Sequence, residues 1–218
     1  MDTDLIKLRK KDDPIRRMVD KGDHDEGPSP MAPPDLYAPP GENQGVPYED
    51  MHPFLQAFRD EHEAITEELS AFEGALAEIL DSGPDREIEA VISSFFRTID
   101  EKVIPHNRQE ERELFPLLAK RLIENGEHSK GETPTTAIDV LTDDHLQLVQ
   151  LSAVIFNFFA VASRLPDAKS RGIVFKAAVE QGQVLAELLR LHMFREDHVV
   201  FSLAHEYLSK EELDAMVG

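Results

Sequence analysis

Four long stretches of the chain carry apolar residues at alternating spacings of three and four, and each of these apolar seams contains a histidine. Such spacing puts the apolar side chains on one face of an α-helix, which is buried against other helices. The stretches are residues 53–80, 85–125, 133–165 and 167–208, and Asp-Ser-Gly-Pro at residues 81–84 breaks the first from the second. Short connections favour antiparallel neighbours. The sequence therefore predicts an all-α fold, an antiparallel up-down-up-down four-helix bundle.

Local signals set the expected ends of these helices. Gly126 is a suitable stop for the second helix, and Thr133, which precedes a proline, is a suitable start for the third. Pro105 lies inside the second helix and is expected to kink or open it, because proline lacks the N–H that a helix needs. Ser209 and Glu212 form the S-x-x-E pattern of a capping box, which predicts a short C-terminal helix.

In each seam a histidine stands where a core apolar residue belongs, and two of the helices add a glutamate four positions later. These residues are His62, His106 with Glu110, His145, and His192 with Glu196. Residues four apart lie on the same face of a helix, so each His–Glu pair can present a nitrogen and an oxygen to one point. A buried carboxylate costs several kcal/mol unless it is paired or binds a metal, and the seams contain no Lys or Arg. The sequence therefore predicts a metal site, in preference to a purely structural polar core.

Composition limits the kind of site. The chain has no cysteine, so disulfides, thiolate catalysis and Cys-ligated metal clusters are excluded. The net charge of −20 argues against nucleic acid and against an anionic membrane surface as partners. Residues 146–162 are the most apolar stretch and are expected to be a buried core helix. The N-terminus has no apolar run of signal-peptide length, so a cytoplasmic location is expected.

The first fifty residues differ from the rest. Residues 5–21 mix basic and apolar side chains, and residues 22–50 are rich in Pro, Gly and Asp. Such a composition favours extended or disordered chain. We therefore expect residues 1–50 to be a tail that precedes a bundle domain at residues 51–218. The alternative is that the tail docks a protein partner.

The body contains an internal repeat. HNRQEERELFPLL, which begins at His106, and HMFREDHVVFSLA, which begins at His192, both read H-x-x-x-E followed by an acidic residue, then an aliphatic residue and phenylalanine. RDEHEAITEEL around His62 parallels TDDHLQLVQLS around His145. The repeat predicts two helical hairpins that each supply His, His and Glu. Two such half-sites facing each other are the arrangement that a dinuclear centre needs.

Over about residues 51–208 the chain resembles the hemerythrin-like family, the HHE cation-binding domain. The resemblance is carried by H-x-x-x-E-E-x-x-L-F-P at residues 106–116. It implies a four-helix bundle with two non-haem iron ions, bridged by oxide or hydroxide when oxidised. It also implies that His62 and His106 bind one iron, that His145 and His192 bind the other, and that Glu110 and Glu196 bridge them.

The chain departs from the oxygen-carrying members in two places. Those members have H-x-x-x-H on the third helix, whereas Leu141 and Val149 stand four residues before and after His145 here. They also have H-x-x-x-x-D on the last helix, which selects Asp197, whereas the internal repeat selects Glu196. These departures argue against reversible oxygen carriage of the usual kind. A site short of one histidine can hold water or expose the metals to small molecules.

Imidazole and carboxylate suit iron, zinc and manganese, and the resemblance favours iron. The leading hypothesis is a protein that binds or senses oxygen, or a related molecule such as nitric oxide or peroxide. The alternatives are an enzyme that decomposes peroxide, an iron- or oxygen-responsive regulator, and a structural bundle without stoichiometric metal. The remaining histidines are expected to lie outside the site, except that His198 is a candidate to orient a ligand; they are His24, His52, His128 and His205.

Overall fold

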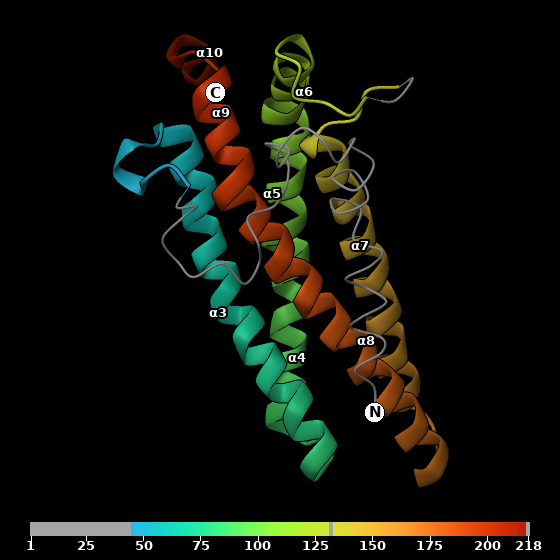
Figure 1. Ribbon diagram of the computed structural model, residues 1–218. Coiled ribbons are helices and arrows are strands. Elements are labelled where there is room, and N and C mark those ends of the chain that lie inside the picture. The colour runs from blue at the N-terminus through green and yellow to red at the C-terminus, as the bar shows by residue number, and fades with distance from the viewer. Residues whose placement is uncertain (1–44, 131–132, 217–218) are drawn as a thin grey trace. The chain divides into compact units, whose positions relative to one another are not determined.

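The computed structural model describes residues 45–130 and 133–216. Within these ranges the chain is helical and contains no strand, which confirms the predicted all-α fold (Figure 1). The predicted tail lies outside the described residues, apart from its last six positions. The chain forms two compact units: unit 1 consists of Met1–Leu55, Glu111–Asp143 and Phe194–Gly218, and unit 2 consists of Gln56–Glu110 and Asp144–Met193.

The first helical hairpin begins with α3 (Pro53–Ser82) and returns through α4 (Arg86–Thr98). Gly83 follows α3 with a φ of 80°, a left-handed conformation that glycine adopts without strain. The side chain of Asp85 then accepts hydrogen bonds from the first free N–H groups of α4, the usual device for starting a helix. The Oγ of Ser94 donates to Glu68, while Phe95 stacks on Phe72 nearby.

The second predicted helix is continuous but not uniformly α-helical. It consists of α4, a π-helical turn η2 (Ile99–Val103), α5 (Ile104–Gln109), a second π-helical turn η3 (Glu110–Leu114) and α6 (Phe115–Glu124). The first π turn ends just before Pro105, so the predicted local opening is confirmed. Gly126, with a φ of 83°, follows the last turn, which confirms the predicted stop.

The third helix, α7 (Ala137–Ala162), begins four residues after the predicted Thr133. The reason is a cap that the sequence analysis missed. Thr136 Oγ1 accepts from the N–H of Ile138 at 3.3 Å, and the N–H of Thr136 donates to Asp139 Oδ2 at 2.7 Å. This reciprocal pair satisfies N–H groups that have no partner inside the helix.

The last long helix also contains a π turn. It consists of α8 (Ala168–Arg195), η4 (Glu196–Val200) and α9 (Phe201–Tyr207), and the short α10 (Lys210–Asp214) follows it. Ser209 and Glu212 form the predicted capping box at the start of α10. In unit 2, contacts of His145 with His192 and of Phe159 with Phe175 show that α7 and α8 run antiparallel. The up-down-up-down order of the whole chain stays a prediction.

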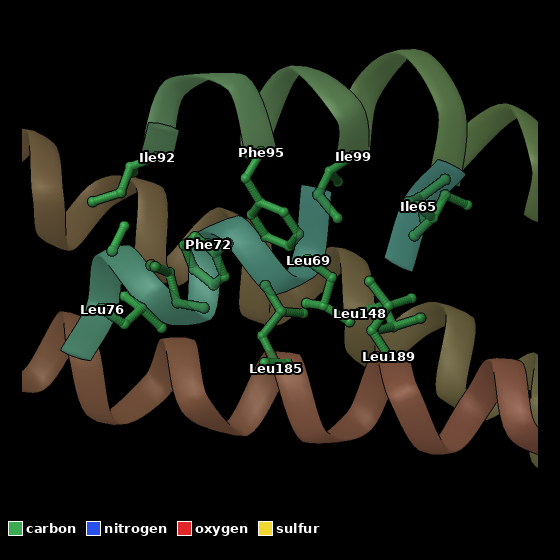
Figure 2. Packing of buried hydrophobic residues seen from close by; sticks show 14 of the residues in the cluster. Ile65, Leu69, Phe72, Leu76, Ile92, Phe95, Ile99, Leu148, Leu185 and Leu189 are labelled. Atoms are coloured by element: carbon green, nitrogen blue, oxygen red, sulfur yellow. The ribbon is translucent and has the colours of Figure 1, made fainter. Parts of the chain in front are cut away.

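The core of unit 2 receives side chains from α3, α4 with η2, α7 and α8 (Figure 2). At its centre Phe72 and Phe95 stack with their ring centroids 4.0 Å apart. Four core residues, Ile65, Val103, Leu148 and Leu189, each lie three positions from a predicted ligand histidine on the same helix, and the core residue Met193 directly follows His192. The apolar core therefore adjoins the histidines.

The α7 helix is only partly the buried helix that its composition predicts. By length and composition alone this helix could cross a membrane. Only 28% of its most apolar window is buried inside the protein. Leu148 and Ile155 are buried on its inner face, whereas Leu146 and Val154 are 58% and 43% exposed on its outer face. The prediction of a buried core helix is therefore wrong for one face of α7.

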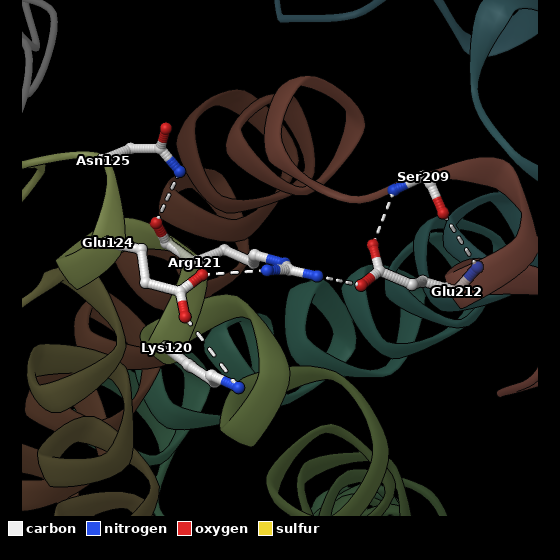
Figure 3. A network of polar contacts seen from close by, with 6 residues as sticks. All are labelled: Lys120, Arg121, Glu124, Asn125, Ser209 and Glu212. Atoms are coloured by element: carbon white, nitrogen blue, oxygen red, sulfur yellow. Dashed lines mark hydrogen bonds and ion pairs between the residues drawn. The ribbon is translucent and has the colours of Figure 1, made fainter.

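Polar contacts hold the C-terminal segment of unit 1 (Figure 3). The guanidinium of Arg121 in α6 contacts the carboxylates of Glu124 and Glu212, and the N–H of Ser209 also donates to Glu212. The Ser209 N–H and the Arg121 guanidinium together lower the pKa of the Glu212 carboxyl from its ordinary value of 4.5. This carboxylate therefore joins α10 to α6 while it is ionised.

We expect Glu212→Gln to lower the urea concentration at which the protein unfolds at neutral pH. Because the pKa of Glu212 is lower in the folded state, its contribution is complete above pH 4.5 and is lost as the pH falls through the lowered value. Urea titrations of both proteins between pH 7 and pH 3 measure this difference. Glu211→Gln removes an exposed neighbouring charge and is the control. A difference that persists at the lowest pH would contradict the prediction.

Two glycines of α8 provide a matched test of core packing. A Cβ at Gly182 would lie 2.7 Å from Leu76 Cδ1 and 3.3 Å from Phe72 Cζ, whereas a Cβ at Gly172 would have no neighbour within 4 Å. We expect Gly182→Ala to lower the free energy of unfolding by about 1–2 kcal/mol through overpacking. We expect Gly172→Ala to raise it by about 0.5–1 kcal/mol, because alanine favours the helix. Chemical denaturation measures both, and equal effects would show that α8 does not approach α3 this closely.

Candidate metal centre

Five of the six predicted ligands lie together in unit 2. The four histidines are only 2–4% exposed and Glu110 is fully buried, although imidazoles and carboxylates usually lie at the surface. They come from all four helical segments of unit 2: His62 from α3, His106 from α5, His145 from α7 and His192 from α8. The sequence pattern therefore predicted correctly that these side chains point into the protein.

Within each hairpin the two histidines are neighbours. His62 Nε2 and His106 Nε2 are 3.1 Å apart. The rings of His145 and His192 have centroids 4.7 Å apart. The 3.1 Å separation allows both nitrogens of the first pair to bind one ion, because metal–nitrogen bonds are about 2.0–2.1 Å long. In the second pair, the ligand atoms of His145 and His192 lie within 4.8 Å of each other.

Glu110 connects the two pairs. Its Oε2 lies 3.6 Å from His106 Nε2 and 3.4 Å from His145 Nε2, so one carboxylate oxygen is close to a histidine of each hairpin. The ligand atoms of Glu110, His145 and His192 all lie within 4.8 Å of one another, as a shared ion requires. A carboxylate in this position is suited to bridge two ions, each held by one pair of histidines.

Two of the three π turns begin at a predicted ligand. Glu110 is the first residue of η3, and Glu196 is the first residue of η4. The H-x-x-x-E repeat of the sequence is therefore also a repeat of the backbone. Turns of this kind are rare and occur frequently at functional sites. The spacing of the apolar residues gave no sign of them, because it fits a regular α-helix on either side.

Glu196 belongs to unit 1, because the division of the chain falls inside α8, between Met193 and Phe194. Glu196 is fully buried, and its carboxylate is one of the groups that could hold an ion. It lies one turn beyond His192 on the same continuous helix. The alternative ligand, Asp197, is only half-buried. Burial therefore favours Glu196, the choice that the internal repeat indicated.

The structure adds two carboxylates that the sequence analysis missed. Glu61 Oε2 lies 2.7 Å from His106 Nδ1, and Asp144 Oδ2 lies 3.6 Å from His192 Nδ1. The hydrogen bond from His106 is the largest cause of a lowered pKa at Glu61. An Nδ1–H that donates to a carboxylate fixes the ring and leaves the Nε2 lone pair for a metal.

These carboxylates had a sequence signal. In each hairpin an acidic residue comes directly before the first histidine, as Glu61-His62 and Asp144-His145, and it reaches the second histidine of the same hairpin. The aligned repeat therefore contains a signal for these two carboxylates. The two sites differ, because the Glu61 contact is a short hydrogen bond while 3.6 Å at Asp144 is beyond hydrogen-bond length.

Arg195 is a further residue that the pattern did not predict. It is 4% exposed and directly precedes Glu196, so unit 1 buries a positive charge next to a negative one in the sequence. The apolar seams themselves contain no basic residue. A basic residue beside the seam can still be buried, and helical periodicity does not reveal this.

Three of the other histidines contact groups that are not predicted ligands. His52 pairs with Asp214 at 3.1 Å, and His128 Nδ1 lies 2.9 Å from the carbonyl oxygen of Ser129. His198 Nδ1 lies 3.0 Å from the carbonyl oxygen of Phe194, on whose ring it also stacks. Both of these contacts of His198 are within its own helix. His205 is exposed, and His24 lies outside the described residues.

The third helix lacks a second inward histidine. Leu141 is 1% exposed and Val149 is 44% exposed, so only the position before His145 faces the interior. The histidine that the oxygen-carrying proteins have would therefore correspond to a buried leucine here.

A scan against protein-family models matches residues 54–204 to a model described as Hemerythrin HHE cation binding domain. The match covers more than half of the chain and includes all six predicted ligands. Searches of the curated proteins and of the solved structures gave no match.

We expect Glu61→Ala to weaken binding of a divalent cation about tenfold to a hundredfold, because His106 loses the group that orients it. Competition with a chromophoric chelator under anaerobic conditions measures the affinity. Glu63→Ala is the matched control, since Glu63 is an exposed acidic residue on the other side of His62. Equal affinities of the two variants would show that Glu61 does not support the site.

Proposed function

Because the chain belongs to the hemerythrin HHE cation-binding family, we propose that it is a non-haem di-iron protein that binds or senses oxygen or a related small molecule, such as nitric oxide or peroxide. The observation that carries this proposal is the buried group of histidines joined by Glu110. Family membership accounts for a bound cation, and the arrangement in two pairs supports two ions.

In this proposal, His62 and His106 hold one iron, and His145 and His192 hold the other. Glu110 bridges the two ions, as its distances to a histidine of each hairpin suggest. Glu196 supplies a second bridging carboxylate from the next turn of its helix. Two cations would offset the cost of burying these carboxylates, which is several kcal/mol for an unpaired charge.

The surroundings suit the binding of a small neutral molecule. A bound iron pair would supply reversible redox chemistry at a buried position. Core residues such as Ile65, Val103 and Leu148 limit the access of water to the histidines. Glu61 holds a proton on His106 Nδ1 and keeps the other ring nitrogen directed toward the centre. Because Leu141 replaces a histidine, a coordination position is left for water or a small ligand.

The same open position also supports a second function, an enzyme that decomposes peroxide. An ion with fewer protein ligands can be reached by peroxide as well as by oxygen. The two functions differ in their products. Binding is reversible and releases the same molecule, whereas decomposition converts peroxide to oxygen and water. A cytoplasmic location and a protein partner for residues 1–50 stay predictions.

We expect the wild-type chain to retain about two iron ions after anaerobic loading and desalting, as paired histidine sites predict. His106→Ala and His192→Ala should each lose about one ion or more, because each removes a ligand of a different pair. Iron assay by chelation and circular dichroism together separate ligand loss from misfolding. His205→Ala replaces an exposed histidine and should keep the full content. Full iron content in both ligand variants would show that the assignment is wrong.

Admission of oxygen to the iron-loaded protein tests the function. For a binding protein, the near-ultraviolet and visible absorbance should change and then return when oxygen is removed. For an enzyme, added hydrogen peroxide should release oxygen repeatedly, well beyond one molecule per centre. An oxygen electrode and a spectrophotometer measure both. No response to oxygen, nitric oxide or peroxide would contradict the proposal even if iron is bound.

A further inference from the structure

Exposed apolar side chains gather on the outer face of α7. Among the described residues the large hydrophobic side chains with the greatest exposure are Tyr48, Ile123, Leu146, Val149, Val154, Phe156, Val161 and Ile173. Five of these eight lie in α7, and three of the five, Leu146, Val154 and Val161, lie on the side of α7 away from His145. A run of apolar side chains along a single helix face is more than scattered exposure, and such patches mark interaction sites.

This face has a central line without charge and with charges of opposite sign at its ends. Leu146, Gln150, Ala153 and Asn157 follow one another at spacings of four, three and four and are all exposed, so they share one side of α7. No Asp, Glu, Lys or Arg occurs between residues 145 and 163. Exposed Asp143 precedes the line.

Arg164 follows the line and is also exposed. Asp143 and Arg164 each stand at an end of the stretch, and the structure gives no ion pair to either of them within the described residues. The face therefore has an acidic end, an apolar and amide-bearing middle, and a basic end.

We propose that α7 pairs with α7 of a second copy of this chain, antiparallel and about a twofold axis between Ala153 and Val154. A twofold axis at this point places Asp143 opposite the partner's Arg164 and Leu146 opposite the partner's Val161, because each pair is equally far from the centre. Gln150 then lies opposite the partner's Asn157, where two amides can hydrogen-bond. Each contact occurs twice, as an isologous interface requires.

Charge explains why a second copy fits better than another occupant. Two chains with a net charge of −20 repel each other over most of their surface, but this face brings no like charges together. A lipid bilayer offers no partner for the amides of Gln150 and Asn157 or for the oppositely charged ends. Small Ala153 at the centre allows the helices to approach closely.

The size of the face sets the strength of the pairing. The three apolar side chains on this face expose roughly 250 Å² per copy, which is much less than the ~800 Å² per partner of a standard interface. We therefore expect a weak, reversible dimer that forms at high protein concentration. The pairing is independent of the metal proposal, since it uses the face of α7 opposite His145.

Sedimentation velocity of the full chain over a range of concentrations tests the pairing. The wild type should dimerise, and Val154→Glu should be monomeric, because it places two like charges at the axis. Arg164→Asp should weaken the dimer about tenfold, by replacing two attractive pairs with two repulsive ones. Asp143→Arg combined with Arg164→Asp should restore it. Iron content and circular dichroism confirm that each variant is folded.

The absence of cysteine allows a second test, by disulfide trapping under mild oxidation. Ala153→Cys should form a covalent dimer, because the two copies of position 153 lie next to each other beside the axis. Asn157→Cys alone should not, whereas Gln150→Cys with Asn157→Cys should. Glu180→Cys, on the exposed face of α8, is the background control.

A chain that stays monomeric at all concentrations would overturn the proposal, as would failure of the double charge reversal to restore dimers. Dimers that form only after removal of residues 1–44 would overturn it too, by showing that this segment covers the face. Binding to phosphatidylcholine vesicles without self-association would assign the face to lipid.

Discussion

The fold depends on one buried carboxylate. Glu110 is fully enclosed, and its oxygen lies between a histidine of the same hairpin and a histidine of the other. A charge in such a place is tolerated only if groups from several elements meet it. Those groups come from separate helices, so the packing of the hairpins and the formation of the centre are one event. The adjoining apolar core supplies the free energy that holds this polar group together.

Most of the fold could be predicted from the sequence because helices with one apolar face have a strong pattern. The seams, the stop at Gly126, the opening before Pro105 and the capping box at Ser209 each rest on local chemistry that the structure confirms. The inward position of the histidines follows from the same pattern. What the pattern does not contain is the hydrogen-bonding register of the backbone, so the π turns at Glu110 and Glu196 were not foreseen.

The remaining differences between the predicted and the observed structure concern helix faces outside the apolar seams. Periodicity shows which side of α7 is buried. In a helix with apolar residues on both sides it leaves open whether the second side is covered, and Leu146 on that side is exposed. Glu61 and Asp144 also lie beside their seams, and only the fold brings them to a histidine on the neighbouring helix. The start of α7 at Ala137, and not at Thr133, depends on the cap that Thr136 forms with Asp139.

The π turns determine which face of each helical segment points inward. A π turn is equivalent to one residue inserted into an α-helix, and such an insertion rotates everything that follows by about 100°. At Glu110 the insertion lies at the ligand itself, so the segment before it and the segment after it present different faces inward. Leu114 and Leu118 can then follow a packing surface of their own without altering the direction of His106. The packing of α6 therefore does not have to follow the face that His106 presents to the centre.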